Sequence, residues 1–158
     1  MTIVGIDPGS HSIGYAVIAG DRYKPTLVRA ETIRFAPRMP AAERLPLVAA
    51  ALAERLRRDA PAGIAVERLF FAKNVNTALP VAETRGIILL TAAAAVPSIW
   101  EYTPLEVKLA VTGSGTATKS QVKKMLALTF GKDALPRGDD AADAIAIALT
   151  ALARDATR

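Results

Sequence analysis

Apolar and polar positions alternate along the first 35 residues in the manner of short β-strands joined by turns. Residues 2–7 and 13–19 are apolar runs on either side of a Pro-Gly-Ser turn, and residues 26–35 alternate well enough for a third strand. Because their connections are tight, these strands are expected to form an antiparallel meander. Two further strands are expected over residues 63–71 and 98–103.

Helical periodicity marks the remaining segments. Apolar residues recur on one face of residues 41–58, and Pro46 sits early there, so the regular helix is expected to begin near Pro46. Further helices are expected over residues 77–95, 104–112, 119–130 and from Asp139 or Asp140 to about 154, the middle two behind the capping boxes Thr103–Glu106 and Thr118–Gln121. This order of elements predicts a single α/β domain over residues 1–158, with a mixed five-stranded sheet flanked by helices.

The composition narrows the classes of function. The chain is 51% hydrophobic and can bury a core, while the absence of cysteine and the single His11 exclude disulfide frameworks and Cys-based or multi-histidine metal sites. A net charge of +5 and a pI near 9.8 are typical of domains that bind polyanions, although many proteins are mildly basic. The longest apolar stretch, Gly86–Val96, is too short to span a bilayer, and no basic segment precedes Asp7 as in a signal peptide. We therefore expect a cytoplasmic protein with no membrane partner.

Four carboxylates lie beside apolar segments. Asp7 ends the first strand and Glu67 follows the apolar run of the fourth, so the two converge at one sheet edge if those strands are neighbours. Asp140 and Asp143 are three residues apart on one face of the last helix, whose acidic end would point at the same edge. Converging carboxylates stay ionised only beside positive charge, and without His or Cys ligands the expected ions are Mg²⁺ or Mn²⁺. Two such ions could support phosphodiester hydrolysis.

Each carboxylate also has an ordinary interpretation when it is taken alone. Asp7 before Pro-Gly-Ser is typical of a turn, and Glu67 could pair with Arg85. Asp139 or Asp140 could be an ordinary helix N-cap. The combination of all these acids favours a shared site.

Four separated motifs lie in order along nearly the whole chain. They are GIDPGSxxxGY at residues 5–15, ERLFFAKN at 67–74, VKLAVTGSGTATKSQV at 107–122 and DAADAIAIA at 140–148. Together they resemble the RuvC family of bacterial Holliday junction resolvases. The resemblance implies an RNase H-like fold, a homodimer, and metal-dependent resolution of four-way DNA junctions by paired symmetric nicks in recombination and repair. It implies catalytic, metal-holding roles for Asp7, Glu67, Asp140 and Asp143, with two Mg²⁺ ions per site and Mn²⁺ as a substitute.

The same resemblance assigns DNA contacts. Phe70 falls on the position of an aromatic side chain that inserts at the junction, and the adjacent Phe71 could share or take over that role. The other implied DNA-binding residues are Lys73, Asn74, Lys108, Gly113, Gly115 and Lys119. The two glycines would let backbone N–H groups approach a phosphate beside Lys119. A branch-migration motor complex of the RuvA and RuvB type is the implied protein partner.

Asp139 departs from the fourth motif, because it adds an acid directly before it. Helical spacing alone does not choose between Asp139 and Asp140 as the partner of Asp143. The motif match favours Asp140 as the ligand and leaves Asp139 as the helix N-cap, although some relatives hold another residue type at the position of Asp140.

Other functions stay open at this stage. GSGTATKS at residues 113–120 nearly matches a phosphate-binding loop, but Thr118 replaces its second glycine and no predicted strand precedes it. Actin-like ATPases and sugar kinases share the architecture and a similar opening loop, but they need a duplicated domain and a longer chain. A related protein that only binds other branched DNA would be expected to lose acids, and here four remain.

The alanine-rich helix over residues 77–95 is apolar over much of its surface, so we expect it to be well buried. Its small residues would allow close approach at a two-fold interface, and the family dimer uses this region. Burial within one subunit and burial between two subunits are the two alternatives.

Overall fold

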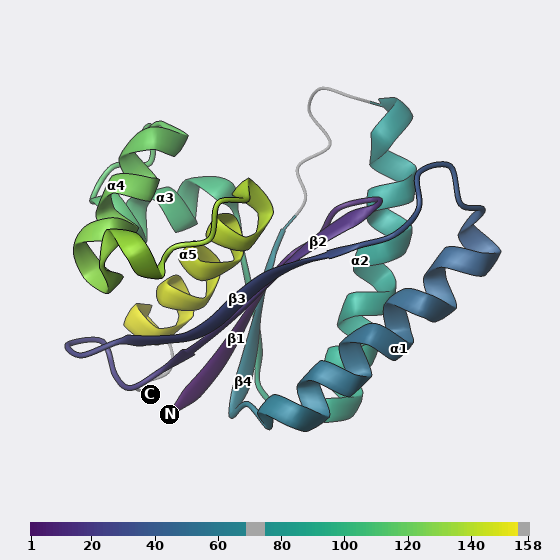
Figure 1. The fold of residues 1–158 in the computed structure, drawn as a ribbon, viewed down its shortest axis with the longest axis horizontal. Helices are drawn as coiled ribbons and strands as arrows, with labels where there is room; N and C mark the ends of the chain where they lie inside the picture. The colour runs from purple at the N-terminus through teal and green to yellow at the C-terminus, as the bar shows by residue number, and fades with distance from the viewer. Residues whose placement is uncertain (69–74, 155–158) are drawn as a thin grey trace.

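The computed structural model describes residues 1–68 and 75–154, in which one mixed sheet lies between two layers of helices (Figure 1). The strands are β1 (Thr2–Asp7), β2 (Ser12–Ala19), β3 (Thr26–Arg34), β4 (Gly63–Glu67) and β5 (Ile99–Tyr102). Their order is β3-β2-β1-β4-β5, antiparallel from β3 to β1 and parallel from β1 to β5. The predicted meander and mixed five-stranded sheet are confirmed. The fourth strand ends at Glu67, and residues 69–71 of its predicted extent lie outside the described ranges.

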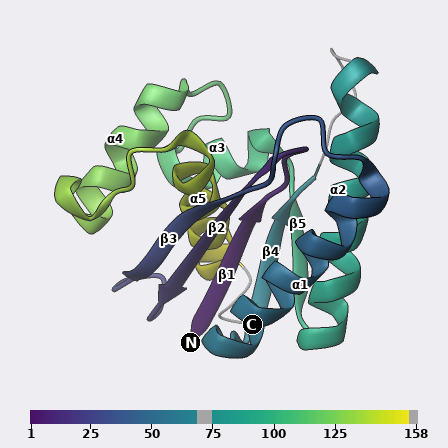
Figure 2. The ribbon, with the colours of Figure 1, turned by 45° about the vertical axis from the view of Figure 1, so that its right-hand side comes forward.

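The helices divide between the two faces of the sheet. They are α1 (Ala41–Asp59), α2 (Val75–Ala95), α3 (Pro104–Thr112), α4 (Lys119–Phe130) and α5 (Asp139–Arg154), with a 3₁₀ turn η1 (Lys132–Ala134) before α5. Both ribbon views place α1 and α2 on one face, and α5 on the other with α3 and α4 beyond it (Figures 1 and 2). Each face has its own cluster of buried apolar side chains, and the three central strands β2, β1 and β4 contribute residues to both clusters.

Both predicted capping boxes are present. The Thr103 hydroxyl accepts a hydrogen bond from the Glu106 N–H at 3.2 Å, and Glu106 accepts one from the Thr103 N–H at 2.9 Å. Thr118 and Gln121 exchange the equivalent bonds at 3.2 and 2.8 Å. These bonds satisfy backbone donors that the first helical turn leaves free, and they make Lys119 the first residue of α4.

The expectation that the first helix begins near Pro46 is wrong. Helix α1 begins at Ala41, and Pro46 lies inside it. The N–H groups of Glu43 and Arg44 both donate to the Pro40 carbonyl, at 3.0 and 2.9 Å, so the first turn closes without the N–H that proline lacks. A proline this close to the N-terminus therefore does not move the start of the helix.

Burial of the alanine-rich helix within one subunit is contradicted for much of its surface, while burial between two subunits stays a prediction. In α2 only Thr84, Ile88 and Ala92 are buried among the residues whose side chains the structure describes, while Leu79 and Leu90 are 67% and 69% exposed. By length and composition the segment Ala78–Ala95 could cross a membrane, although a core helix can pass the same test. Ile88 and Ala92 pack in the apolar cluster between α2, α1 and the sheet. One face of α2 thus belongs to the core and another faces solvent.

Candidate active site

Two carboxylates lie side by side where neighbouring parallel strands end. The register of β1 and β4 pairs Ile6 with Val66, so Asp7 and Glu67 follow at the same edge of the sheet. Ile6 and Val66 face the α1–α2 core, and alternation along each strand therefore turns Asp7 and Glu67 toward the α5 face. The predicted convergence of these two residues is confirmed.

Two glycines allow α5 to approach this part of the sheet closely. A Cβ atom at Gly5 would lie 2.2 Å from the Ala144 carbonyl oxygen, and a Cβ atom at Gly14 would lie 2.0 Å from the Asp140 carbonyl oxygen. Such distances are far below van der Waals contact, so larger residues would push α5 away. The sequence reading did not single out either residue, although an isolated glycine within a strand often marks a close backbone approach.

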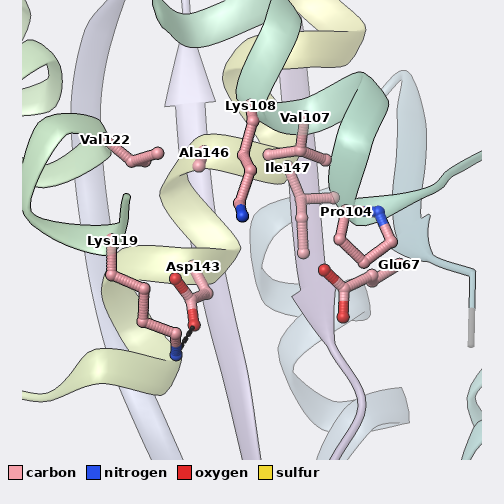
Figure 3. Close-up of a pocket in the computed structure, with 9 residues that line it drawn as sticks. All are labelled: Glu67, Pro104, Val107, Lys108, Lys119, Val122, Asp143, Ala146 and Ile147. Carbon is pink, nitrogen blue, oxygen red and sulfur yellow. Dashed lines mark hydrogen bonds and ion pairs between the residues drawn. The ribbon is translucent and has the colours of Figure 1, made fainter. Parts of the chain in front are cut away.

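The close approach brings the acidic end of α5 to the strand carboxylates. Asp143 lines a cavity of about 280 Å³ together with Glu67. Figure 3 shows both carboxylates at this cavity, with Lys119 from α4 beside Asp143 and the Lys108 side chain from α3 pointing toward the same space. Lys119 Nζ donates to Asp143 Oδ2 at 3.1 Å. Segments far apart in the sequence thus bring acids and lysines to one site.

Burial and mutual repulsion raise the pKa of two carboxyl groups. Burial, and then the charges of Glu67, Asp143 and Asp140, raise the pKa of Asp7 to about 8. Burial and the charge of Asp143 raise the pKa of Glu67 to about 7. The Lys119 ammonium lowers both pKa values, but it does not offset the other effects. Of the two, Glu67 lines the cavity and Asp7 is close enough to interact with it, and perturbed carboxyl groups in such a place are typical of functional sites.

Ordinary interpretations of these acids do not fit the contacts. Asp7 pairs with Gly14 within the β1–β2 ladder and is therefore a strand residue and not part of a turn. Arg85 does not pair with the Glu67 carboxylate, because its guanidinium contacts the Glu67 backbone carbonyl and the Glu101 carboxylate instead. The side chains of Asp7 and Glu67 are thus left to the site.

Asp139 lies apart from the cavity, but it is not the helix N-cap that we expected. Helix α5 begins at Asp139, which places it within the first turn. Its carboxylate accepts a hydrogen bond from Lys123 Nζ at 2.5 Å, and this contact holds the pKa of Asp139 below its ordinary value. The acids of α5 therefore divide, since Asp139 pairs outward with α4 while Asp140 and Asp143 act on Asp7.

Two of the predicted DNA-binding residues line the cavity, two lie in the loop before α4, and four lie outside the described residues. Lys108 and Lys119 line the cavity beside Glu67 and Asp143. Gly113 has φ of +79° as the C-cap of α3, so local structure already requires a glycine there. A Cβ atom at Gly115 would lie 3.0 Å from the exposed Leu105 side chain, which would only have to shift slightly. The remaining predicted contacts lie outside the described residues: Phe70, Phe71, Lys73 and Asn74.

The loop at residues 113–118 follows a helix, which argues against the phosphate-binding loop of nucleoside triphosphatases. In that motif a strand leads into the glycine-rich loop, whereas here α3 leads into it and α4 follows. The glycines and Lys119 therefore belong to a helix–loop–helix connection beside the acidic site.

The donor set suits a hard divalent cation. Asp7, Glu67, Asp140 and Asp143 offer carboxylate oxygens, which Mg²⁺ and Mn²⁺ prefer. Burial, and then repulsion from neighbouring acids, disfavours the ionised forms of Asp7 and Glu67, and a bound cation would offset both effects. Within residues 1–68 and 75–154, no three acidic or histidine side chains already lie close enough to hold an ion. The carboxylates fit an ion by chemistry and charge, and they would need to draw together around it.

Comparison with known proteins agrees with the geometry. A family model described as crossover junction endodeoxyribonuclease RuvC matches residues 3–151. A crossover junction endodeoxyribonuclease RuvC from Pelotomaculum thermopropionicum is 43% identical over 151 residues, covering 94% of this chain and 91% of the relative. The structure of Thermus thermophilus RuvC in complex with a Holliday junction substrate superposes with a TM-score of 0.87 at 38% identity, covering 95% and 92% of the two chains. The RNase H-like fold expected from the motifs is thereby established. The chain belongs to the RuvC family of crossover junction endodeoxyribonucleases.

Proposed function

We propose that this protein resolves four-way DNA junctions by paired, symmetric, magnesium-dependent nicks during recombination and repair. The observation that carries the proposal is the meeting of Asp7, Glu67 and Asp143, from three separate elements, in one site with lysines at its edge. Family membership supports the junction as substrate. A protein that only bound branched DNA would have no need of this costly cluster of acids.

The carboxylates would hold the metal, with Asp7, Glu67 and Asp143 central and Asp140 at the side nearest Asp7. When bound, two Mg²⁺ ions would stabilise the negative charge that develops as a phosphodiester bond breaks, and Mn²⁺ would serve as a substitute. Burial and neighbouring acids raise the pKa values of Asp7 and Glu67 to about 8 and about 7, so protons would compete with a cation for these carboxylates near neutral pH. The cluster is thus poised to exchange protons for metal.

The lysines would position the DNA strand. Lys108 and Lys119 reach the cavity that Glu67 and Asp143 line, and their ammonium groups can bind non-bridging phosphate oxygens. Contacts of this kind fix the register of the backbone and carry no sequence information. Gly113 and Gly115 would bring backbone N–H groups to the same strand, and Phe70, Phe71, Lys73 and Asn74 would contact the junction itself.

A homodimer is the assembly that this function requires, because two symmetric cuts need two sites and each chain carries one. The solvent face of α2 supports this assembly. Leu79, Gly86 and Leu90 are exposed at spacings of seven and four residues, which places them on one side of the helix. A Cβ atom at Gly86 would meet nothing within 4 Å, so a second α2 helix could approach closely there. We further propose a cytoplasmic location and cooperation with a branch-migration motor of the RuvA and RuvB type.

The test is a comparison of two substrates of identical sequence. A synthetic four-way junction and the matching linear duplex are incubated with the protein in Mg²⁺, and nicks are mapped on each labelled strand. We expect nicks on two strands of like polarity at symmetric positions in the junction, and little cleavage of the duplex. Equal cleavage of both substrates would contradict junction resolution.

A further inference from the structure

Arg85 of α2 fastens the end of the strand that carries Glu67. Its Nε donates to the Glu67 backbone carbonyl oxygen at 3.2 Å, and its Nη2 pairs with the Glu101 carboxylate on β5. One guanidinium thus joins α2, β4 and β5. Its side chain is 20% exposed and that of Glu101 is 34% exposed, so water only partly screens the pair.

The Glu67 carbonyl lies just beyond the end of the β1–β4 ladder. The last pair between β1 and β4 is Ile6 with Val66, one residue before Glu67. On the other side, the Arg68 N–H donates to the Tyr102 carbonyl oxygen at 2.7 Å and closes the β4–β5 ladder. Because Arg85 provides the hydrogen bond to the Glu67 carbonyl, it holds a peptide that lies beyond the last β1–β4 pair.

Arg85 and the Glu67 carboxylate lie on opposite faces of the sheet. Arg85 projects from α2, on the α1–α2 face, whereas the Glu67 side chain lines the cavity on the α5 face with Asp143. Arg85 therefore cannot touch a substrate in that cavity through the sheet. Its contact with Glu67 is the hydrogen bond to the backbone carbonyl.

A second ion pair fixes the helix from which Arg85 projects. Arg44 of α1 is buried, with its side chain 4% exposed, and its Nη2 lies 3.3 Å from Glu83 Oε2 on α2. Its Nη1 donates to the Met39 carbonyl oxygen at 3.3 Å. Glu83 is two residues from Arg85, so α2 is tied to α1 directly beside the guanidinium.

We propose that Arg85 is a positioning residue, which sets the direction of the Glu67 carboxylate by holding its backbone carbonyl from the opposite face of the sheet. The proposal rests on the proposed function, because it assumes that Glu67 holds the metal. A planar guanidinium suits the task, since it can serve a carbonyl and a carboxylate at once, which a lysine ammonium does less well. The placement of a catalytic acid would then depend on the packing of α2.

The test measures the response to Mg²⁺ in Arg85→Met and Arg85→Lys variants. Loss of a group that orients a metal ligand typically costs about 10–100-fold in metal affinity or activity. We expect Arg85→Met to need at least about tenfold more Mg²⁺ for half-maximal single-turnover nicking, or to nick at least about tenfold more slowly at saturation. Arg85→Lys should fall between Arg85→Met and wild type. Junction binding, measured by gel shift in Ca²⁺, should stay within about twofold of wild type for both variants.

A readout without DNA separates positioning from general damage. The Mg²⁺-induced rise in Tm reports metal binding to the folded protein. It should shrink in Arg85→Met, and adding Arg85→Met to a Glu67→Gln variant should shrink it no further, because the effect passes through Glu67. Arg154→Met is the matched control. It removes an arginine that pairs with the Glu106 carboxylate in the first turn of α3, and it should leave the Mg²⁺ response unchanged.

The outcomes distinguish the positioning role of Arg85 from the proposed nuclease function. If wild-type protein nicks with Mg²⁺ and Arg85→Met shows the same metal response and rate, the proposed positioning role of Arg85 is wrong. An equal further loss in the Glu67→Gln background would also overturn it. If Arg85→Met does not fold, Arg85→Lys decides by the same criteria. Wild-type protein that neither nicks nor gains Tm with Mg²⁺ would instead contradict the proposed function.

Discussion

Asp7 of β1 lies directly opposite Gly14 of β2 in the sheet register. A Cβ atom added to Gly14 would lie 3.1 Å from the Asp7 Cβ and 2.0 Å from the Asp140 carbonyl oxygen. The absent side chain thus determines how close the acidic end of α5 comes to the acid at the end of β1. The site is built by close packing of backbones as much as by the acids themselves.

Gly14→Ala should therefore damage the site without removing any charged group. The methyl group must push α5 outward or displace β2, which typically costs about 1–3 kcal/mol for overpacking in a core. Because misplacement by about 1 Å can cost a factor of about 10² in rate, we expect single-turnover nicking to fall at least about tenfold. Thermal unfolding and nicking on the same preparation measure both effects. A variant with wild-type stability and rate would contradict the inference that Gly14 is needed for the close packing of α5 on the sheet.

The pH dependence of nicking should follow the ionisation of Glu67 and Asp7. Their pKa values are raised to about 7 and about 8, so both groups hold protons at low pH and become carboxylates as pH rises, which the proposed metal would require. At limiting Mg²⁺, the single-turnover rate should increase between about pH 6 and pH 9. Saturating Mg²⁺ should move the profile to lower pH, because the ion favours the ionised forms.

Lys119→Ala gives an independent check of the same profile. The Lys119 ammonium lowers the pKa of both Asp7 and Glu67, so its removal should move the midpoint to higher pH. Lys132→Ala, which removes an exposed lysine just beyond the other end of α4, is the control and should leave the midpoint unchanged. Nicking that is flat from pH 6 to pH 9 at limiting Mg²⁺ would contradict the assigned ionisations.

The acids of α5 should respond differently to amide substitution. Asp139 pairs with Lys123 at the surface, and exposed pairs of this kind contribute little because water and salt screen them, so Asp139→Asn should nick at close to the wild-type rate. Asp140→Asn and Asp143→Asn remove negative charge that acts on Asp7, and each should slow single-turnover nicking by at least about 10²-fold. A crippled Asp139→Asn beside an active Asp140→Asn would reverse the assignment.

The exposed face of α2 should mediate dimer formation. Leu90 is 69% exposed on α2, and a buried glutamate at an apolar two-fold interface would face its own copy. We expect Leu90→Glu to sediment as a monomer and to lose paired nicking. Leu128→Glu, at an equally exposed leucine on α4, should sediment like wild type. The dimer proposal fails if wild type and Leu90→Glu are both monomers, with and without junction DNA.

Features set by neighbouring residues were predictable from the sequence. The capping boxes at Thr103 and Thr118 depend on contacts three residues apart, and strand alternation placed Asp7 and Glu67 at strand ends. The convergence of Asp7 and Glu67 depended on β1 pairing with β4. That pairing joins segments about 60 residues apart in the chain, so the sequence could not establish it and the structure was needed. The four motifs supplied the family, and with it the architecture.

Features set by packing were missed or predicted wrongly. The length and apolar character of α2 suggested a buried helix. Composition does not tell whether the surface that covers such a helix belongs to the same chain or to another one. Arg85 reads as a candidate partner for the Glu67 side chain, and only the fold shows that it binds the Glu67 backbone from the opposite face. The Pro46 prediction failed because the carbonyl of Pro40 closes the first turn of α1.

The most direct test of the central claim is single-turnover nicking of a labelled four-way junction by wild-type protein and Asp7→Asn, in Mg²⁺ and in excess chelator. The account predicts paired nicks only for wild type in Mg²⁺, while Asp7→Asn binds the junction with little loss of affinity because the lysines remain. Wild-type nicking that persists in excess chelator, or Asp7→Asn that nicks at the wild-type rate in Mg²⁺, would contradict a metal-dependent carboxylate site.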